Sequence, residues 1–223
     1  MYHSMTELVI GDDLPVFHLE SFCKTDAGII LLQEWWGVTD HMKMMARRIA
    51  NYINAEILIP DLYRGKVAGG ADEAKHLMDG LDWNKALQDV QECQKWLAMK
   101  GSARVVCIGF CMGGALSMAA SARVCGLLGC VVFYGIPSAD LIQPQECKVP
   151  LCLHFGNEDR SLGFSDPKTL DETVSKLNVE HMVWKYDGVG HAFMNEDRDT
   201  YKQDAAKQAL LRTIDFIKRV ARI

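Results

Sequence analysis

The sequence lacks the features that would direct it to a nucleic acid, a membrane or a metal ion. Its 24 Lys and Arg residues stand against 29 Asp and Glu residues, a formal net charge of −5, and no basic run appears, so we expect no nucleic-acid partner. No apolar stretch approaches the roughly 20 residues of a membrane helix, so we expect no membrane contact. No group of Cys and His residues has the spacing of a zinc site, and we expect neither a metal nor a cofactor.

A disulfide framework and a secretion signal are also missing. The eight cysteines form no close C-x-x-C pair, and several lie inside strand-like apolar runs, as is typical of reduced thiols. Residues 1–5 have neither the charged nor the apolar region of a signal peptide. We therefore expect a cytoplasmic protein.

Short apolar runs alternate with amphipathic stretches along the whole chain. Residues 28–32 and 57–59 are continuous apolar runs, as in strands covered on both faces. Between and after them, residues 40–52, 83–100 and 201–220 carry apolar positions at helical spacing. With 223 residues, of which 49% are hydrophobic, the chain is predicted to form one domain, residues 1–223, of the α/β class. Its sheet should be mostly parallel, with helices on both faces.

A glycine-rich turn around Cys111 joins a strand-like run, residues 104–108, to a helix-like run, residues 115–120. The sequence matches the G-x-S-x-G motif of the nucleophile elbow, with cysteine in place of serine. Glycines around such a turn remove side chains that would collide, and the first amides of the helix favour a thiolate. The alternative is an ordinary turn that holds a small buried cysteine.

An acid and a histidine follow Cys111, each just beyond a strand-like run. Asp159 comes after residues 150–155, and His191 comes after residues 180–186. Nucleophile, acid and histidine, in this order, is the order of α/β-hydrolase triads, and ligands bind at these strand ends in parallel sheets. Glu158 and Asp166 compete with Asp159 for the role of the acid. The sequence therefore predicts a triad of Cys111, Asp159 and His191.

Five separated motifs give the chain a resemblance to a known family. They are residues 33–38 (QEWWGV), 60–63 (PDLY), 109–114 (GFCMGG), 155–159 (FGNED) and 190–193 (GHAF). Over nearly its whole length the chain resembles the dienelactone hydrolase family, the cysteine branch of the α/β-hydrolase fold. The resemblance implies that fold and a metal-independent, carboxymethylenebutenolidase-like hydrolase of a small lactone or ester. It also implies that Cys111 is the nucleophile, and it suggests a monomer.

The resemblance adds Glu34, which matches a glutamate that interacts with the nucleophile. A carboxylate beside a thiol repels a thiolate, so we expect Glu34 to keep Cys111 protonated until a substrate displaces it. The alternative is that Glu34 caps the following helix or pairs with a nearby base. In the expected reaction the backbone N–H groups of Met112 and Trp35 hold the oxyanion while Cys111 becomes a thioester.

Four further residues are predicted to contact the substrate. Family members that open dienelactones bind the substrate carboxylate with arginines. Arg64 stands one residue away from the first of these positions, and Asn195 occupies the second, four residues after His191. Trp36 and Phe193 are predicted to line an apolar pocket, although both could instead belong to the core.

Two other functions are compatible with the sequence. Another α/β family, of glyoxalase or protease-like proteins, also pairs an elbow cysteine with a glutamate, but the order of Asp159 and His191 argues against it. A non-catalytic small-molecule-binding or redox-sensing protein on a hydrolase scaffold is the alternative from a different class, with Cys111 as a sensitive thiol.

Overall fold

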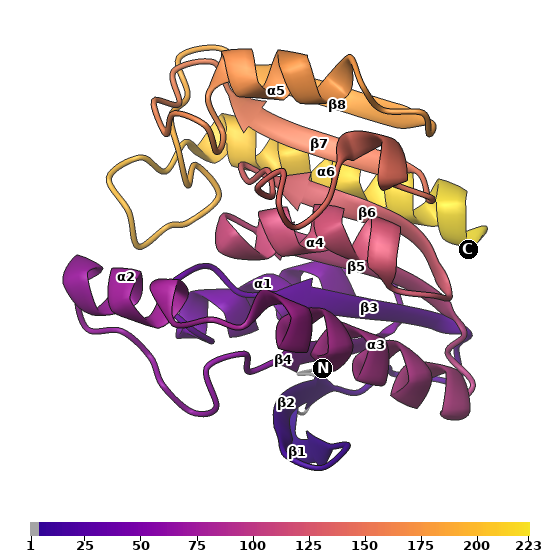
Figure 1. Ribbon diagram of the computed structural model, residues 1–223. Helices are drawn as coiled ribbons and strands as arrows, with labels where there is room; N and C mark the ends of the chain where they lie inside the picture. The colour runs from indigo at the N-terminus through magenta and orange to yellow at the C-terminus, as the bar shows by residue number, and fades with distance from the viewer. Residues whose placement is uncertain (1–4) are drawn as a thin grey trace.

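Eight strands form one sheet in the computed structural model, which describes residues 5–223 (Figure 1). The strand order is β1-β2-β4-β3-β5-β6-β7-β8. The first two strands form an antiparallel hairpin, β2 is antiparallel to β4, and all further neighbours are parallel. The strands are β1 (Met5–Ile10), β2 (Leu14–Leu19), β3 (Ala27–Leu32), β4 (Glu56–Pro60), β5 (Arg104–Phe110), β6 (Leu127–Phe133), β7 (Leu151–Gly156) and β8 (His181–Tyr186).

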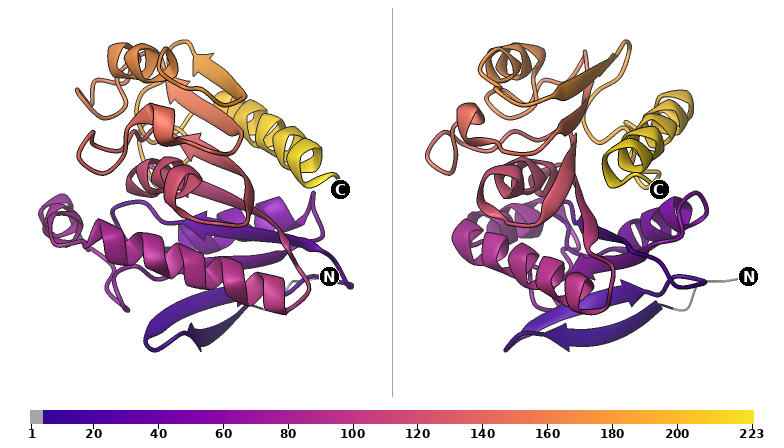
Figure 2. Two further views of the ribbon diagram at one scale, coloured as in Figure 1. Left: turned by 45° about the vertical axis from the view of Figure 1, so that its right-hand side comes forward. Right: turned by 90° about the vertical axis from the view of Figure 1, so that its right-hand side faces the viewer.

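Helices cover both faces of this sheet. Figure 2 shows α1 and α6 on one side, with α3, α4 and α5 on the other. The helices are α1 (Asp40–Ala50), α2 (Ala71–Asp79), α3 (Trp83–Met99), α4 (Met112–Arg123), α5 (Pro167–Val174) and α6 (Gln203–Ala221), with a short 3-10 turn η1 (Pro144–Glu146). A mostly parallel sheet between two helical layers confirms the predicted fold class.

The sheet separates two hydrophobic cores. One core packs α3 and α4 against the sheet, and the other packs α1 and α6 against its opposite face. Every residue of β3 is buried, which explains why its sequence is apolar throughout rather than alternating. The central strands carry their loops to the carboxyl edge of the sheet, where the arrows of Figure 1 end.

One helix was not apparent from the hydrophobic pattern. In α2, only Ala74 is buried, so the helix presents no apolar stripe that sequence reasoning could find. Residues 61–70 connect β4 to this helix without helix or strand. The expectation of a missing signal peptide rests largely on residues 1–4, which lie outside the described residues. Within residues 5–223, no helix combines the length and the apolar character needed to span a bilayer.

Candidate active site

The turn between β5 and α4 holds Cys111 in a strained conformation. Cys111 is the residue before the first turn of α4 and has φ 53° and ψ −116°. A non-glycine residue with positive φ is uncommon and costs about 1–3 kcal/mol, so it persists only where its surroundings impose it. Its side chain is thereby turned out of the backbone at the carboxyl edge of the sheet.

The glycines around Cys111 are required by close packing of the backbone. A Cβ atom added to Gly109 would lie 1.8 Å from the carbonyl oxygen of Gly113. A Cβ atom on Gly113 would lie 2.5 Å from the carbonyl oxygen of Gln33. Helix α4 therefore begins in contact with both β5 and the loop after β3, and only glycine permits this approach.

Three side chains from three loops meet at the mouth of this turn. The Nε2 atom of His191 lies 3.2 Å from the Sγ atom of Cys111. Its Nδ1 atom lies 2.7 Å from the Oδ2 atom of Asp159. The other oxygen of Asp159 accepts a hydrogen bond from the backbone N–H of Ser161 at 2.9 Å. The structure thus brings together the three residues that the sequence predicted to form a triad.

Asp159 and His191 each stabilise the charged form of the other. Burial alone would raise the pKa of Asp159, but the hydrogen bond and positive charge of His191 outweigh it and lower that pKa. Burial alone would lower the pKa of His191, but its hydrogen bonds with Asp159 and Cys111 raise it to about 10. His191 therefore keeps a proton across the neutral range, available to a leaving group.

Glu34 lies buried beside this row, with only 2% of its surface exposed. The Oε1 atom of Glu34 accepts a hydrogen bond from the Tyr134 hydroxyl at 3.1 Å, and its Oε2 atom accepts one from Asn195 Nδ2 at 2.6 Å. Burial raises the pKa of Glu34, while those hydrogen bonds and the charge of His191 oppose the increase. None of the Glu34 hydrogen bonds found in residues 5–223 involves Cys111. The repulsion between the Glu34 carboxylate and a Cys111 thiolate therefore stays a prediction.

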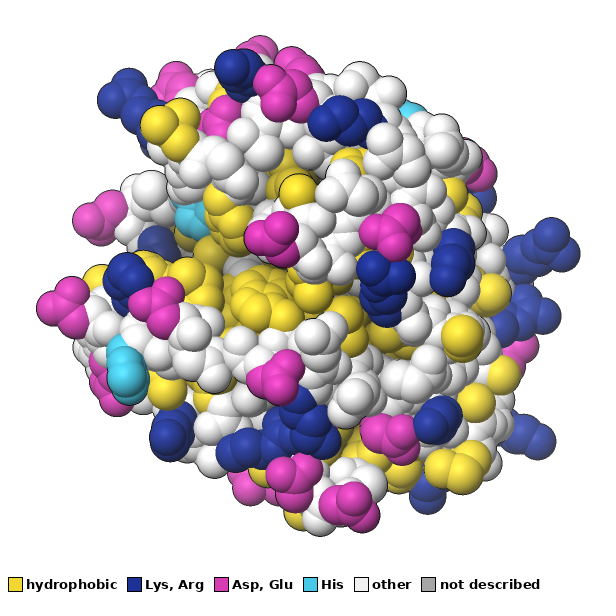
Figure 3. Space-filling model, in the orientation of Figure 1, with side chains coloured by type: hydrophobic (Ala, Val, Ile, Leu, Met, Phe, Trp, Pro, Cys, Tyr) yellow, Lys and Arg dark blue, Asp and Glu magenta, His cyan; other side chains and the backbone are white. Residues whose placement is uncertain are grey.

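A cleft of about 510 Å³ opens in front of Cys111 and His191. It is lined by Trp35, Trp36, Met78, Cys111, Ser161, Phe164, His191, Ala192, Arg198, Asp199 and Thr200. We call it the Cys111 cleft. Figure 3 shows the molecule hollowed between its upper and lower halves, with hydrophobic side chains gathered in the hollow. An apolar cleft with few polar groups suits a small organic ligand.

The oxyanion hole predicted for this site consists of the backbone N–H groups of Met112 and Trp35. Met112 is the first residue of α4, and the first N–H groups of a helix have no partner within it. Trp35 follows β3 and also lines the Cys111 cleft. Among the backbone hydrogen bonds found in residues 5–223, neither N–H donates to a loop or turn carbonyl, which leaves both available to a ligand.

Comparison with known proteins places this arrangement in a family. A model of the dienelactone hydrolase family matches residues 17–221. The chain belongs to the dienelactone hydrolase family. It is therefore an enzyme of the carboxylic ester and lactone hydrolase class, and its sheet and helices are those of the α/β-hydrolase fold.

Individual dienelactone hydrolase relatives align over most of the chain. Protein usf of Aquifex pyrophilus is 30% identical over 206 residues, which cover 86% of this chain and 87% of that protein. A protein of Aquifex aeolicus (strain VF5) with the provisional name carboxymethylenebutenolidase is 28% identical and covers 85% and 87%. The solved structure of a dienelactone hydrolase-like promiscuous phosphotriesterase from metagenomic libraries superposes with a TM-score of 0.83, at 17% identity and 99% coverage of both chains. This last similarity shows the fold alone.

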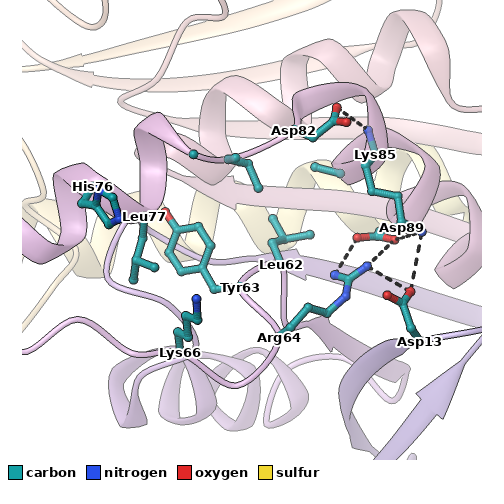
Figure 4. Close-up of a pocket in the computed structure, with 13 residues that line it drawn as sticks. Asp13, Leu62, Tyr63, Arg64, Lys66, His76, Leu77, Asp82, Lys85 and Asp89 are labelled. Atoms are coloured by element: carbon teal, nitrogen blue, oxygen red, sulfur yellow. Dashed lines mark hydrogen bonds and ion pairs between the residues drawn. The ribbon is translucent and has the colours of Figure 1, made fainter.

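Three of the four predicted substrate contacts of this dienelactone hydrolase family member do not line the Cys111 cleft. Arg64 lies beside a separate cavity of about 450 Å³, where its guanidinium is held by Asp89 at 2.8 Å and by Asp13 at 3.4 Å (Figure 4). Phe193 is fully buried in the core, as its alternative interpretation proposed. Asn195 is also buried and bonds to Glu34 instead of a ligand. Only Trp36 lines the Cys111 cleft as predicted.

The competing acids have other positions. The Oδ1 atom of Asp166 accepts a hydrogen bond from the backbone N–H of Thr169 at 3.1 Å and so caps α5. Glu158 lines a different polar cavity. Asp159 is thus the acid that contacts the histidine. Within residues 5–223, no group of three or more His, Cys, Asp and Glu side chains is placed to hold a metal ion.

Sequence reasoning missed several residues of the site. Ser165 contacts both Asp159 and His191, and the rings of Tyr134 and His191 form a T-shaped pair with their centres 5.1 Å apart. Arg198, whose guanidinium lies 3.7 Å from the ring centre of Trp36, supplies a positive charge to the Cys111 cleft. None of these three belongs to a recognisable motif, so only their positions in space reveal them.

Proposed function

We propose that this enzyme hydrolyses a small lactone or ester through a Cys111–His191–Asp159 triad and a thioester acyl-enzyme. The observation that carries the proposal is the continuous row of contacts from Asp159 through His191 to Cys111, at 2.7 and 3.2 Å. The row ends at a strained elbow facing the Cys111 cleft, which provides a place for the reacting carbonyl.

The reaction then follows from the geometry. The thiolate of Cys111 attacks the carbonyl carbon, and the backbone N–H groups of Met112 and Trp35 stabilise the negative charge on the carbonyl oxygen. His191 donates its Nε2 proton to the departing oxygen, and the C–O bond breaks to leave a thioester on Cys111. A water molecule gives a proton to His191 and attacks the thioester, and the C–S bond breaks to release the acid and restore the thiolate–imidazolium pair.

The same chemistry restricts the substrate class. A thiolate is a good leaving group, so a tetrahedral intermediate returns to substrate unless the other group departs easily. This favours lactones, enol esters and thioesters over amides. The walls of the Cys111 cleft formed by Trp35, Trp36 and Phe164 suit an apolar acyl or ring portion.

The test of this function is hydrolysis of three substrates: a dienelactone, a neutral aryl acetate and a thioester. Turnover of any one, accompanied by a mass increase of the protein equal to the acyl group, supports the proposal. If no substrate is turned over and no adduct forms, the result favours the alternative of a non-catalytic binding or redox-sensing protein. Reaction of the wild type with iodoacetamide, with and without the lactone, then tests that alternative.

Replacing Arg198 by alanine is expected to raise the KM for an anionic substrate about 10-fold to 100-fold, the value of one hydrogen bond to a charged group. Arg198 lines the Cys111 cleft, and among residues 5–223 its buried Nε atom has no hydrogen-bond partner. The measurement compares the KM of a carboxylate-bearing lactone with that of a neutral aryl acetate. Arg160, which lines a different cavity, provides the control variant Arg160→Ala. An equal rise for both substrates would show that Arg198 acts only by packing on Trp36.

Replacing Glu34 by glutamine is expected to lower the pKa of His191. The negative charge of Glu34 stabilises the imidazolium. The oxygen of a neutral amide can still accept the hydrogen bond of Asn195, and its NH2 group can donate to the Tyr134 hydroxyl. Titration of the His191 ring protons by NMR, in the wild type and in Glu34→Gln, measures the shift. Identical titration curves would mean that the charge of Glu34 does not act on His191.

A further inference from the structure

Ser165 occupies a position between the acid and the histidine. Its Oγ atom lies 2.7 Å from Asp159 Oδ2 and 3.0 Å from His191 Nδ1. Because Asp159 Oδ2 and His191 Nδ1 are themselves 2.7 Å apart, the three atoms form a closed triangle of hydrogen-bond distances. The side chain of Ser165 is completely buried.

The proton positions in this triangle follow from the donors and acceptors available. An ionised carboxylate only accepts, so the Ser165 hydroxyl donates to Asp159. His191 Nδ1 must then carry a proton, which lies between Asp159 Oδ2 and the free lone pairs of Ser165 Oγ in a three-centre hydrogen bond. The remaining ring nitrogen, Nε2, is left to face Cys111.

The turn that carries Ser165 donates a hydrogen bond to each oxygen of the Asp159 carboxylate. The backbone N–H of Ser161 holds Oδ1 of Asp159 at 2.9 Å, and the Ser165 hydroxyl holds Oδ2. Ser165 N–H donates to the carbonyl of Ser161 at 3.0 Å, which closes the turn, and the carbonyl of Phe164 accepts a hydrogen bond from Ile136 N–H at 2.9 Å. This turn is thus hydrogen-bonded to the segment after β6.

A purely structural role does not account for the hydroxyl. A buried hydroxyl needs a partner, and both partners of Ser165 Oγ in residues 5–223 are the Asp159 carboxylate and the His191 ring. By contrast, the fully buried Ser117 and the nearly buried Ser121 donate to backbone carbonyl groups of Cys107 and Met118. Ser165 therefore differs from these two serines, because its hydroxyl contacts the acid and the histidine.

We propose that Ser165 is a positioning residue of the hydrolase, which fixes the rotation of the Asp159 carboxylate and keeps the His191 ring with Nε2 directed at Cys111. This inference rests on the proposed triad function. Without the hydroxyl, Oδ2 of Asp159 keeps only its contact with His191, and the carboxylate can turn away from Nδ1. The ring then loses its orientation, and both the reactivity of Cys111 and the acyl-transfer step decline.

The experiment compares Ser165→Ala with Ser121→Ala, a matched removal of a buried hydroxyl away from the triad. We expect Ser165→Ala to lower kcat about 10-fold to 100-fold, the value of a hydrogen bond to a charged group, with KM changed less than about 2-fold. Its rate of alkylation by iodoacetamide at neutral pH should fall as well. Ser121→Ala should retain the wild-type kcat and alkylation rate. Thermal unfolding of both variants reports the shared effect of losing a buried hydroxyl.

The outcomes separate this inference from the function on which it rests. Wild-type kcat and alkylation rate in Ser165→Ala would overturn the positioning role, and so would equal losses in both serine variants. A Cys111→Ala variant measured in parallel tests the triad itself. If Cys111→Ala is inactive while Ser165→Ala matches the wild type, only the role of Ser165 fails. If Cys111→Ala remains active, the proposed function fails first.

Discussion

Replacement of Cys111 by alanine is expected to lower kcat by about 10⁴-fold or more, because no other group replaces the nucleophile of a triad. Cys111 is the side chain that meets His191 Nε2 at 3.2 Å. It stands where the strained turn directs it into the Cys111 cleft. The measurement is the initial rate on the lactone, aryl acetate and thioester panel, together with the intact mass of the protein after mixing. The variant should show neither turnover nor an acyl adduct.

The fold should survive this change. Alanine removes only the sulfur atom, and it meets the same positive φ as cysteine does. The melting temperature of Cys111→Ala should therefore stay close to that of the wild type. Cys125, an exposed free cysteine, provides the control Cys125→Ala, which should keep full activity. Hydrolysis by Cys111→Ala at the rate of Cys125→Ala would remove Cys111 from the mechanism.

Replacement of Gly109 by alanine is expected to destabilise the folded state by about 3 kcal/mol or more. The new Cβ atom would lie 1.8 Å from the carbonyl oxygen and 2.2 Å from the carbonyl carbon of Gly113. Both are backbone atoms in the first turn of α4, so the helix itself has to move. The displacement would carry Cys111 away from His191 and reduce activity together with stability.

The free energy of unfolding in urea measures this effect, with Gly70→Ala as the matched control. Gly70 precedes α2 with φ −160°, and a Cβ atom there meets nothing within 4 Å. The control should unfold at nearly the same urea concentration as the wild type. If Gly109→Ala were as stable as Gly70→Ala, the close approach of β5 and α4 would not be what requires glycine at the elbow.

Much of the fold was accessible from the sequence because its signals are local. The apolar run predicted at residues 28–32 corresponds to β3, and the stripe predicted at residues 83–100 corresponds to α3. Burial on both faces leaves a strand no polar position, and burial on one face leaves a helix one stripe. The short helix α2 escaped prediction because a single buried residue, Ala74, leaves no stripe.

The meeting of Cys111, Asp159 and His191 was also predictable, for a topological reason. Each residue follows a strand of a parallel sheet, and the carboxyl ends of such strands lie at one edge. The order along the chain and the position after each strand are properties of the sequence. They place the three loops together without knowledge of any side-chain rotamer.

The fold class, the elbow and the three residues at the sheet edge thus follow from local patterns of the sequence. Which other side chains reach the Cys111 cleft depends instead on how the loops pack against one another. Arg64 forms an ion pair with the buried Asp89 of α3, and Asn195 donates a hydrogen bond to Glu34. Arg198 instead stacks on Trp36 at the wall of the Cys111 cleft. The physical reason is that a polar side chain on a loop forms its hydrogen bonds or ion pairs with whichever buried polar group lies within reach. That partner comes from a distant part of the chain and exists only after the loops have packed.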